Sequence, residues 1–533
     1  MALPSLYPDV EIPDVSVPAH VLSAGGTRPD APALVDGLKG DTITHGQLAA
    51  YVDRVAAALH ARGLRKGDVV AVFCPNTPWY PVVFHGIAAA GCVMSPINSL
   101  YTPDEIAFQL RDSGAKVLIT VSPFLDRVRA AVDQAPVDEI VVMDGAEGHP
   151  SLLDLLSTDA PSVQVDIDPA QDLVTLPYSS GTTGLPKGVM LTHRNLVANV
   201  VQMRPIMDVH EGDERIIAVL PFFHIYGLTV LMNQGLAVGG TVVTLPRFDL
   251  EDFLRVIQDQ RITRAFVAPP IVLALAKHPL VDQFDLSSLR TITSGAAPLD
   301  ESLALACQQR LRQGADTGVT VAQGYGMTEL SPVSHSTPDT GQEPPGAAAD
   351  VPKGSVGYAL PNTECRLVDP ATGEDVAAGL RGELWVRGPQ VMKGYLNNPQ
   401  ATADTLDGEG WLHTGDVAVV DEHGHYTVVD RVKELIKYKG YQVAPAELEA
   451  VLLGHPEIAD AAVIGVLEEE SGEELPKAFV VRAAGSSLTP ETVMEYMAGK
   501  VAPHKKIRFV EFIEQVPKSS AGKILRKELK AAR

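Results

Sequence analysis

A glycine-rich stretch between residues 178 and 189, YSSGTTGLPKGV, has the composition of an anion-binding loop. Its hydroxyl side chains and backbone N–H groups could hold phosphate oxygens, and Lys187 would add a charge-assisted hydrogen bond. The stretch follows a strand-like run, as a phosphate loop should. It does not match the pattern GxxxxGK[ST], because Pro186 precedes the lysine and Gly188 follows it. By itself it is therefore either a structural turn or a mobile flap over the β- and γ-phosphates of a nucleotide.

A second glycine-rich stretch, QGYGMTEL at 323–330, could bind the rest of a nucleotide. Tyr325 stands between two glycines and could lie flat against a purine. We predict a glycine-rich turn here, with Thr328 and Glu329 at the base of the site. A lone glutamate is usually a surface residue, but a carboxylate in this place could bind Mg²⁺, which prefers one or two carboxylates together with phosphate oxygens.

Four further residues could carry chemistry, and each alone has an ordinary structural explanation. Asp416 ends GWLHTGD, and Arg431 follows it in DRVKELIK, so the two could bind the hydroxyls of a ribose. His224 lies in PFFHIYGL where a loop enters a predicted helix, although a single histidine there is more often a core residue. Lys523 lies in a loop before a short amphipathic helix, although an exposed lysine near the end of a chain is usually solvated.

The composition excludes some classes of partner. The 533 residues include 43 Lys and Arg against 66 Asp and Glu, a formal net charge of −23, so neither nucleic acid nor an anionic membrane is expected as the main partner. The cysteines lack metal-ligand spacing and are expected to be reduced and partly buried. We see no signal peptide and no membrane span, and the apolar run PVVFHGIAAAGCVM is predicted to be a buried helix leading to a strand. The expectation is a cytoplasmic enzyme.

The elements that must position these residues are predicted to be of α/β type. β-branched runs alternate with helical stretches over residues 69–145 and again over 214–298, which predicts two doubly wound βαβ subdomains with mostly parallel sheets. From about residue 352, closely spaced turns indicate a β subdomain. We predict a large N-terminal domain, 1–429, and a small α+β C-terminal domain, 430–533, on a hinge that carries a local basic patch.

Taken together and in order, the motifs resemble those of the adenylate-forming (AMP-binding) superfamily, over roughly residues 25 to 530. The matching stretches are YSSGTTGLPKGV, QGYGMTE, GELWVRGP, GWLHTGD, DRVKELIKYKGYQVAPAELE and PKSSAGKILRKEL. Within the superfamily the chain looks most like 4-coumarate:CoA ligases, through PFFHIYGL, SGAAPL and the unbroken LIKYKGYQVAPAELE. The resemblance implies two steps: a carboxylate attacks the α-phosphate of MgATP to give acyl-adenylate and pyrophosphate, and the thiol of coenzyme A then displaces AMP.

The resemblance also implies a role for each matched residue. Lys523 would bridge the attacking carboxylate and the phosphate, His224 would orient the carboxylate, Glu329 would bind magnesium, and Lys433 would be the hinge. The residues expected to bind ATP or AMP are Ser179, Ser180, Gly181, Thr182, Thr183, Lys187, Gln323, Gly324, Tyr325, Thr328, Asp416 and Arg431. Those expected to serve the second step are Lys437 and Gln442 at the catalytic centre and Arg247, Lys439 and Gly440 toward coenzyme A.

The acyl pocket is the part where this chain departs from plant coumarate ligases. By the resemblance it would be lined by Tyr226, Val230, Gly295, Ala296, Gly324 and Val333, with glycines leaving room for a flat ring. Thr293 stands where the plant enzymes commonly carry lysine, and SPVSH replaces a more apolar segment. The resemblance implies a hydroxycinnamate as the acid, and because of these departures a medium- or long-chain fatty acid is the alternative.

Three other functions are open from the sequence: an enzyme that loads a carrier protein, a luciferase-like oxygenase and a non-enzymatic AMP sensor. The chain is expected to act as a monomer or homodimer.

Overall fold

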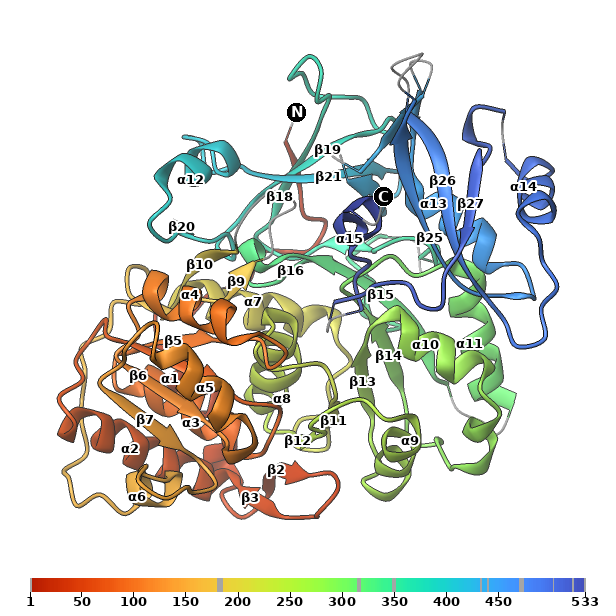
Figure 1. Ribbon diagram of the computed structural model, residues 1–533. Helices are drawn as coiled ribbons and strands as arrows, with labels where there is room; N and C mark the ends of the chain where they lie inside the picture. The colour runs from red at the N-terminus through yellow and green to blue at the C-terminus, as the bar shows by residue number, and fades with distance from the viewer. Residues whose placement is uncertain are drawn as a thin grey trace.

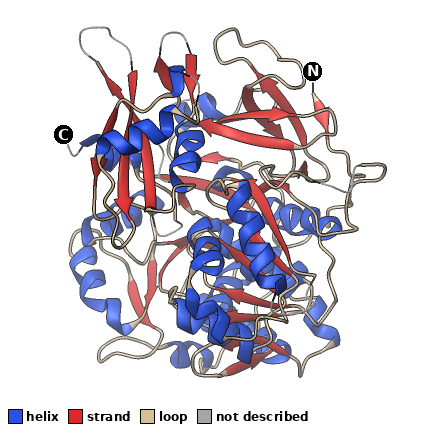
Figure 2. Cartoon of the chain, turned by 90° about the vertical axis from the view of Figure 1, so that its right-hand side faces the viewer, coloured by secondary structure: helices blue, strands red, loops and turns tan. Residues whose placement is uncertain are grey.

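The computed structural model describes residues 2–179, 186–313, 318–347, 351–431, 434–438, 441–468, 474–501, 503–519 and 522–531. Its lower body in Figure 1 consists of two α/β layers that lie side by side, and the C-terminal part, in blue, lies above the second of them. The view turned by 90° shows helices covering the strands of this body (Figure 2). The α/β class and the large N-terminal region with a smaller C-terminal one are thereby confirmed.

The first α/β layer is built on a sheet whose central strands are parallel. β4 pairs in parallel with β5 and β6, and β6 with β7. Every residue of β5 and β6 is buried, as expected for strands that helices cover on both faces. In spatial order the strands are β20 (Gly394–Tyr395), β10 (Lys187–Thr192), β8 (Leu173–Thr175), β5 (Val93–Pro96), β4 (Val69–Phe73), β6 (Val117–Thr120) and β7 (Glu139–Val142), with β9 (Tyr178–Ser179) also paired to β10.

Helices of this first region include the helix predicted from the apolar run before residue 93. That helix is α3 (Trp79–Ala89), which is buried along most of its length and leads into β5, as the sequence predicts. The others are α1 (Val17–Val21), α2 (His45–Ala61), α4 (Pro103–Ser113), α5 (Leu125–Val132) and α6 (Leu152–Leu156). No helix within the described ranges is long and apolar enough to cross a membrane.

The second layer carries most of the candidate site. Its sheet has parallel pairs from β11 through β13 and β14 to β15. In spatial order the strands are β17 (Tyr358–Ala359), β16 (Val333–Ser336), β15 (Thr320–Gly326), β14 (Thr291–Ser294), β13 (Arg264–Val267), β11 (Arg215–Ala218), β12 (Thr241–Thr244), β2 (Pro32–Asp36) and β3 (Thr42–Thr44). The helices are α7 (His193–Met203), η4 (Tyr226–Asn233, of π type), α8 (Gln234–Ala237), α9 (Leu250–Asp259), α10 (Pro269–Lys277) and α11 (Glu301–Gln313).

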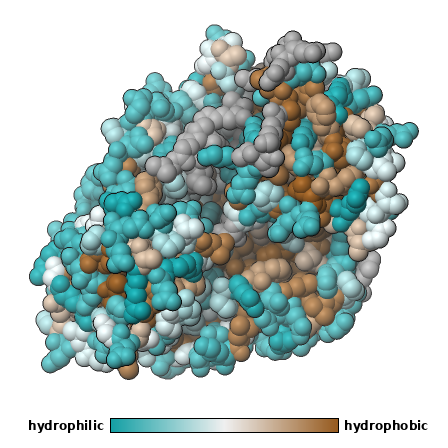
Figure 3. All heavy atoms as spheres, in the orientation of Figure 1, coloured by the Kyte–Doolittle hydropathy of each residue, from teal (hydrophilic) through white to brown (hydrophobic). Residues whose placement is uncertain are grey.

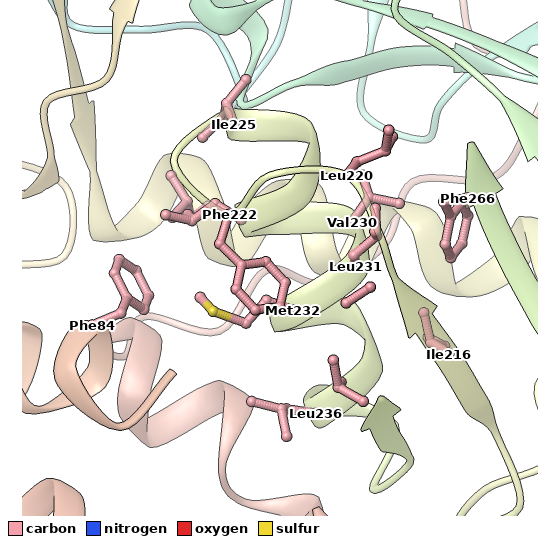
Figure 4. Close-up of a cluster of buried hydrophobic side chains, with 14 of the residues drawn as sticks. Phe84, Ile216, Leu220, Phe222, Ile225, Val230, Leu231, Met232, Leu236 and Phe266 are labelled. Atoms are coloured by element: carbon pink, nitrogen blue, oxygen red, sulfur yellow. The ribbon is translucent and has the colours of Figure 1, made fainter. Parts of the chain in front are cut away.

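A continuous hydrophobic core joins the two layers. Phe84 of α3 lies near Phe222 and Met232, which belong to the loop and helix after β11 (Figure 4). Val230 and Phe266 lie on the other side of the same helix, toward β13. All five side chains are at most 2 % exposed, so η4 is held from both sides. This packing fixes the loop that carries His224.

The predicted β subdomain forms, with two differences. Its antiparallel strands are β18 (Glu364–Val368), β19 (Gly382–Arg387), β21 (Leu412–Val420) and β22 (Tyr426–Arg431), and α12 (Pro399–Thr405) precedes β21. The first difference is that β1 (Leu3–Pro4) joins this sheet by pairing with β18. The second is that β17 and β20 leave it for the two α/β sheets. Both depend on backbone pairing between distant segments, which local sequence patterns do not encode.

The C-terminal part has a hydrophobic cluster of its own. The elements of the C-terminal part are the hairpin β23 (Ile436–Tyr438) and β24 (Tyr441–Val443), the strands β25 (Ile458–Leu467), β26 (Glu474–Arg482) and β27 (Phe509–Phe512), and the helices α13 (Pro445–Leu453), α14 (Pro490–Ala498) and α15 (Arg526–Ala531). Ile436 and Val443 are fully buried in that cluster. The exact limits of the two domains and the hinge at Lys433, which lies outside the described residues, stay predictions.

Candidate active site

The candidate residues gather at the carboxyl edge of the second sheet. The loop after β11 carries His224, the loop after β13 carries Ala268, and Gly295 follows β14 directly. Tyr325 lies near the end of β15. Because parallel strands bring their carboxyl ends to one edge, residues distant in the sequence meet there, which is the usual ligand-binding edge of an open α/β sheet.

The stretch QGYG is a strand and not a glycine-rich turn, so that prediction is wrong. β15 runs through Gly326, parallel to β14 and antiparallel to β16. A Cβ on Gly326 would lie 2.0 Å from the carbonyl oxygen of Pro332. Gly326 therefore lets the backbones of two strands approach closely. From the sequence, a glycine at this position looked like part of a turn.

Tyr325 and Asp416 are in direct contact. The Tyr325 hydroxyl donates a hydrogen bond to Oδ2 of Asp416 at 2.7 Å, and Asp416 is 6 % exposed. Asp416 stands opposite Arg431 in the antiparallel pair of β21 and β22. The fold thus brings together three of the residues predicted to bind ATP or AMP, although the side chain of Arg431 lies outside the described structure.

The side chain of Gln323 makes two hydrogen bonds to the backbone of neighbouring loops. Its side-chain oxygen accepts a 2.6 Å hydrogen bond from the backbone N–H of Leu299, and its amide nitrogen donates to the carbonyl oxygen of Ser355 at 3.4 Å. The side chain is 4 % exposed. Gln323 therefore ties two loops together beside the site, and its contact with ATP or AMP stays a prediction.

Glu329, the predicted magnesium ligand, is held by two hydroxyl groups. Its Oε1 accepts hydrogen bonds from Oγ of Ser179 at 3.0 Å and from the hydroxyl of Tyr395 at 2.8 Å. The ammonium group of Lys187 lies 4.4 Å from the centre of the Tyr395 ring. Thr328 begins the short 3₁₀ turn η6 (Thr328–Leu330) that carries the glutamate. Ser179 and Lys187, on either side of the undescribed part of the glycine-rich stretch, therefore lie close to the glutamate of QGYGMTEL.

Tyr395 is a member of this cluster that sequence reasoning missed. It lies in MKGYLNNP, between the motifs GELWVRGP and GWLHTGD, and no spacing relates it to Glu329. The pairing of β20 with β10 brings it there, with Tyr395 opposite Val189. A preceding glycine and the run of turn residues after it are the only local signals.

An apolar cavity of about 60 Å³ lies at the same edge, and all six residues predicted for the acyl pocket line it. The Tyr226 hydroxyl donates a 3.2 Å hydrogen bond to the carbonyl oxygen of Thr293, and its ring meets that of Phe266 edge-on at 6.5 Å. A Cβ on Gly295 would lie 2.9 Å from the Tyr226 ring. Lining residues that the sequence did not reveal include Met203, Phe266, Met327 and Pro332.

His224 lines this cavity as well and is influenced by Lys523. Burial and the positive charge of Lys523 lower the pKa of His224 to about 4, so its imidazole is neutral at physiological pH. Its Nδ1 accepts a hydrogen bond from the backbone N–H of Tyr226 at 3.3 Å. A histidine that only packs in the core would have no reason to line a cavity near a lysine of the C-terminal part. The position of His224 therefore favours a role in binding the acid over a purely structural one.

The loop that carries Lys523 sits against the end of β13. A Cβ on Gly522 would lie 3.3 Å from Ala268 and 3.5 Å from Pro270. The loop is closed by hydrogen bonds between the backbones of Ser519 and Lys523 at 2.8 Å and of Gly522 and Ser519 at 2.8 Å. In Figure 3 hydrophobic residues gather where the C-terminal part meets the body below it. The C-terminal part therefore delivers Lys523 to the carboxyl edge.

The remaining predicted residues are not at this edge or are not described. Lys437 and Gln442 are opposite each other in the backbone register of the β23–β24 hairpin, which packs within the C-terminal part, and their side chains are outside the described structure. Arg247 is exposed in the loop after β12. The residues that lie outside the described part of the chain are Ser180, Gly181, Thr182, Thr183, Lys433, Lys439 and Gly440.

The described part of the chain holds neither a metal-binding cluster nor an exposed thiol. Within the described residues, no group of three or more His, Cys, Asp and Glu side chains could hold a metal ion. The four cysteines are buried and unpaired, and burial raises the pKa of the Cys307 and Cys365 thiols to about 12.

Comparison with known proteins agrees with this geometry. The family model "AMP-binding enzyme" matches residues 23–396, and "AMP-binding enzyme C-terminal domain" matches 447–523. A 4-coumarate–CoA ligase 2 of Nicotiana tabacum is 41 % identical over 98 % of this chain and 96 % of its own.

Solved structures give the same result for the whole chain. ATP-bound MatB from Rhodopseudomonas palustris has a TM-score of 0.86 at 30 % identity, covering 98 % of this chain and 99 % of its own, whereas its apo form has a TM-score of 0.76. The anthranilate CoA ligase AuaEII in complex with anthranoyl-AMP has a TM-score of 0.85 at 28 % identity, with 98 % of both chains covered. The chain therefore belongs to the AMP-binding enzyme family and is an AMP-forming acid–thiol ligase.

Proposed function

We propose that the chain joins 4-coumarate, or a related hydroxycinnamate, to coenzyme A at the expense of ATP. The observation that carries this proposal is the apolar cavity that Tyr226, Phe266 and His224 help to line, with His224 influenced by the charge of Lys523. A flat aromatic acid in this cavity would have two rings to pack against and its carboxylate near a cation. The similarity to coumarate and anthranilate ligases supports the same class of acid.

In the first step, an oxygen of the acid's carboxylate forms a bond to the α-phosphorus of ATP while the bond from that phosphorus to the pyrophosphate oxygen breaks. Tyr325 and Asp416 would hold the nucleoside, and Lys187 would hold the departing phosphates. Lys523 would stabilise the negative charge shared by the carboxylate and the α-phosphate, which is where charge must be neutralised for two anions to react. His224, neutral because its pKa is about 4, would orient the carboxylate without protonating it.

Glu329 is the residue that would hold magnesium. Among the described residues no hydrogen bond or ion pair engages its Oε2, whereas Oε1 accepts two hydrogen bonds, so one carboxylate oxygen is left for a cation. This arrangement fits an ion that takes one or two carboxylates and phosphate oxygens. When bound there, Mg²⁺ would neutralise charge on the phosphates.

In the second step, the thiol of coenzyme A attacks the acyl carbon and AMP leaves. We propose that the C-terminal part rotates about Lys433, withdraws Lys523 and brings Lys437, Lys439, Gly440 and Gln442 to the site, while Arg247 meets the phosphates of coenzyme A. The greater similarity to the ATP-bound than to the apo form of MatB supports the view that the described arrangement is the one for the first step.

A substrate panel tests the proposed acid. AMP release that depends on coenzyme A is measured with coumarate, caffeate, ferulate, cinnamate, benzoate, octanoate and palmitate. We expect the highest kcat/KM for a hydroxycinnamate, because a flat ring fills a short aromatic cavity better than a flexible chain does. Palmitate as the best acid, with cinnamates inert, would show that the fatty acyl ligase is the correct alternative.

Gly295→Ala tests where the acid binds. The added methyl group meets the Tyr226 ring at 2.9 Å and must displace it. Overpacking of this kind costs about 1–3 kcal/mol, so we expect kcat/KM for the preferred acid to fall by about 5- to 160-fold while KM for ATP is unchanged. Gly408→Ala is the matched control, because a Cβ there has no neighbour within 4 Å. If Gly295→Ala changed only the kinetic parameters for ATP and left kcat/KM for the acid unchanged, the acid would have to bind elsewhere.

A further inference from the structure

Tyr395 contacts two of the residues assigned to the triphosphate end of the site. Its hydroxyl donates the 2.8 Å hydrogen bond to Oε1 of Glu329, and its ring lies 4.4 Å from the ammonium of Lys187. Tyr395 and Glu329 are each 5 % exposed. One side chain therefore joins the predicted magnesium ligand to the predicted phosphate ligand.

The backbone around Tyr395 is fixed at several points. Its N–H donates to Oγ1 of Thr402 at 2.9 Å, and the next N–H, of Leu396, donates to the carbonyl oxygen of Gly188 at 2.8 Å. The N–H of Met392 donates to the carbonyl oxygen of Glu329 at 2.9 Å. A phenol held on such a frame has little freedom to move away from the glutamate.

The direction of the hydrogen bond follows from the chemistry of the two groups. The Tyr395 phenol carries an O–H, whereas an ionised carboxylate only accepts, so Tyr395 donates to Glu329. With Ser179 donating to the same atom, Oε1 accepts two hydrogen bonds, which leaves Oε2 as the oxygen that could bind a cation.

We propose that Tyr395 is a positioning residue with two contacts. Its hydroxyl holds Oε1 of Glu329 and so orients this carboxylate toward magnesium, and its ring holds the ammonium of Lys187 in place for the phosphates. This inference rests on the proposed function of the site. Outer groups that hydrogen-bond a metal-binding carboxylate fix its orientation, and their loss commonly lowers metal affinity by 10- to 100-fold. The backbone pairing of β10 with β20 is what makes the two contacts simultaneous.

Two substitutions separate the two contacts. Tyr395→Phe keeps the ring and loses the hydroxyl, so we expect the Mg²⁺ concentration for half-maximal ATP–pyrophosphate exchange to rise about 10- to 100-fold, with KM for the acid unchanged. Tyr395→Leu also loses the ring, so KM for ATP at saturating Mg²⁺ should rise a further 2- to 30-fold or so. Calorimetric titration of the protein with ATP, with and without Mg²⁺ and without any acid, should show the Mg²⁺-dependent gain in affinity reduced in Tyr395→Phe.

The control is Tyr358→Phe, which removes another buried phenol hydroxyl, one bonded to His425 at 2.7 Å and away from the site. Thioester formation from supplied acyl-adenylate and coenzyme A should be normal in all three variants, which shows that they fold. Equal Mg²⁺ dependence in Tyr395→Phe and Tyr358→Phe, by exchange and by calorimetry, would overturn the proposal. If the wild-type protein were inactive with every acid of the panel, the proposed function would be overturned. The calorimetric titration would still test the role of Tyr395, because it uses ATP and Mg²⁺ without any acid.

Discussion

Replacing Lys523 with alanine is expected to lower the rate of acyl-adenylate formation by about 100- to 1,000-fold, the usual effect of removing one group that stabilises transition-state charge. Thioester formation from supplied acyl-adenylate should be nearly unaffected. The reason is that Lys523 is the cation that the C-terminal part places near His224, where the carboxylate of the acid and the α-phosphate would meet. Pyrophosphate exchange measures the first step, and thioester formation from synthetic acyl-adenylate measures the second.

Lys518→Ala is the matched control for this variant. Lys518 lies in the same loop but pairs with Asp460 at 2.6 Å, away from the cavity, so both half-reactions should be close to normal. A second readout does not depend on activity: the positive charge of Lys523 lowers the pKa of His224, so this pKa, followed by NMR, should rise in Lys523→Ala. Equal loss of both half-reactions, or an unchanged histidine pKa, would contradict the assignment.

Replacing Asp416 with alanine is expected to raise KM for ATP by about 100-fold or more. Two charge-assisted hydrogen bonds to the ribose hydroxyls are worth about 1.5–3 kcal/mol each, and both would be lost. The substitution also removes the partner of the Tyr325 hydroxyl, which is 2.7 Å from Oδ2 of Asp416. Steady-state kinetics at saturating acid and calorimetric titration with MgATP measure the effect.

Two further variants make the result for Asp416 specific. Tyr325→Phe keeps the aromatic face and loses only the hydroxyl, so KM for ATP should rise much less than in Asp416→Ala. Asp375→Ala changes a partly exposed carboxylate near the same β sheet, paired with Arg366 at 2.8 Å, and KM for ATP should not change. If Asp416→Ala altered the KM for the acid and not that for ATP, the nucleoside would have to bind elsewhere.

Much of the fold could be predicted from the sequence because its signals are local. The buried runs that became β4, β6, β11 and β13 are continuous and β-branched, and they alternate with helical stretches, a pattern typical of strands covered on both faces. The convergence of the Lys187 and Glu329 motifs, and of the six acyl-pocket residues, also agrees with the resemblance to a family whose motifs keep their order.

The sequence by itself predicted the chemistry that the chain would carry: a glycine-rich phosphate motif, a tyrosine and an aspartate for the nucleoside, a glutamate for a cation and a lysine near residue 523. The tertiary structure alone decided which atoms meet. It turned QGYG into a strand, used Gln323 to tie loops together, placed Lys523 near His224 and brought Tyr395 under Lys187 and against Glu329. These contacts depend on backbone pairing and packing between segments far apart in the chain, and such non-local interactions leave no periodic or spacing signal in the residues that make them.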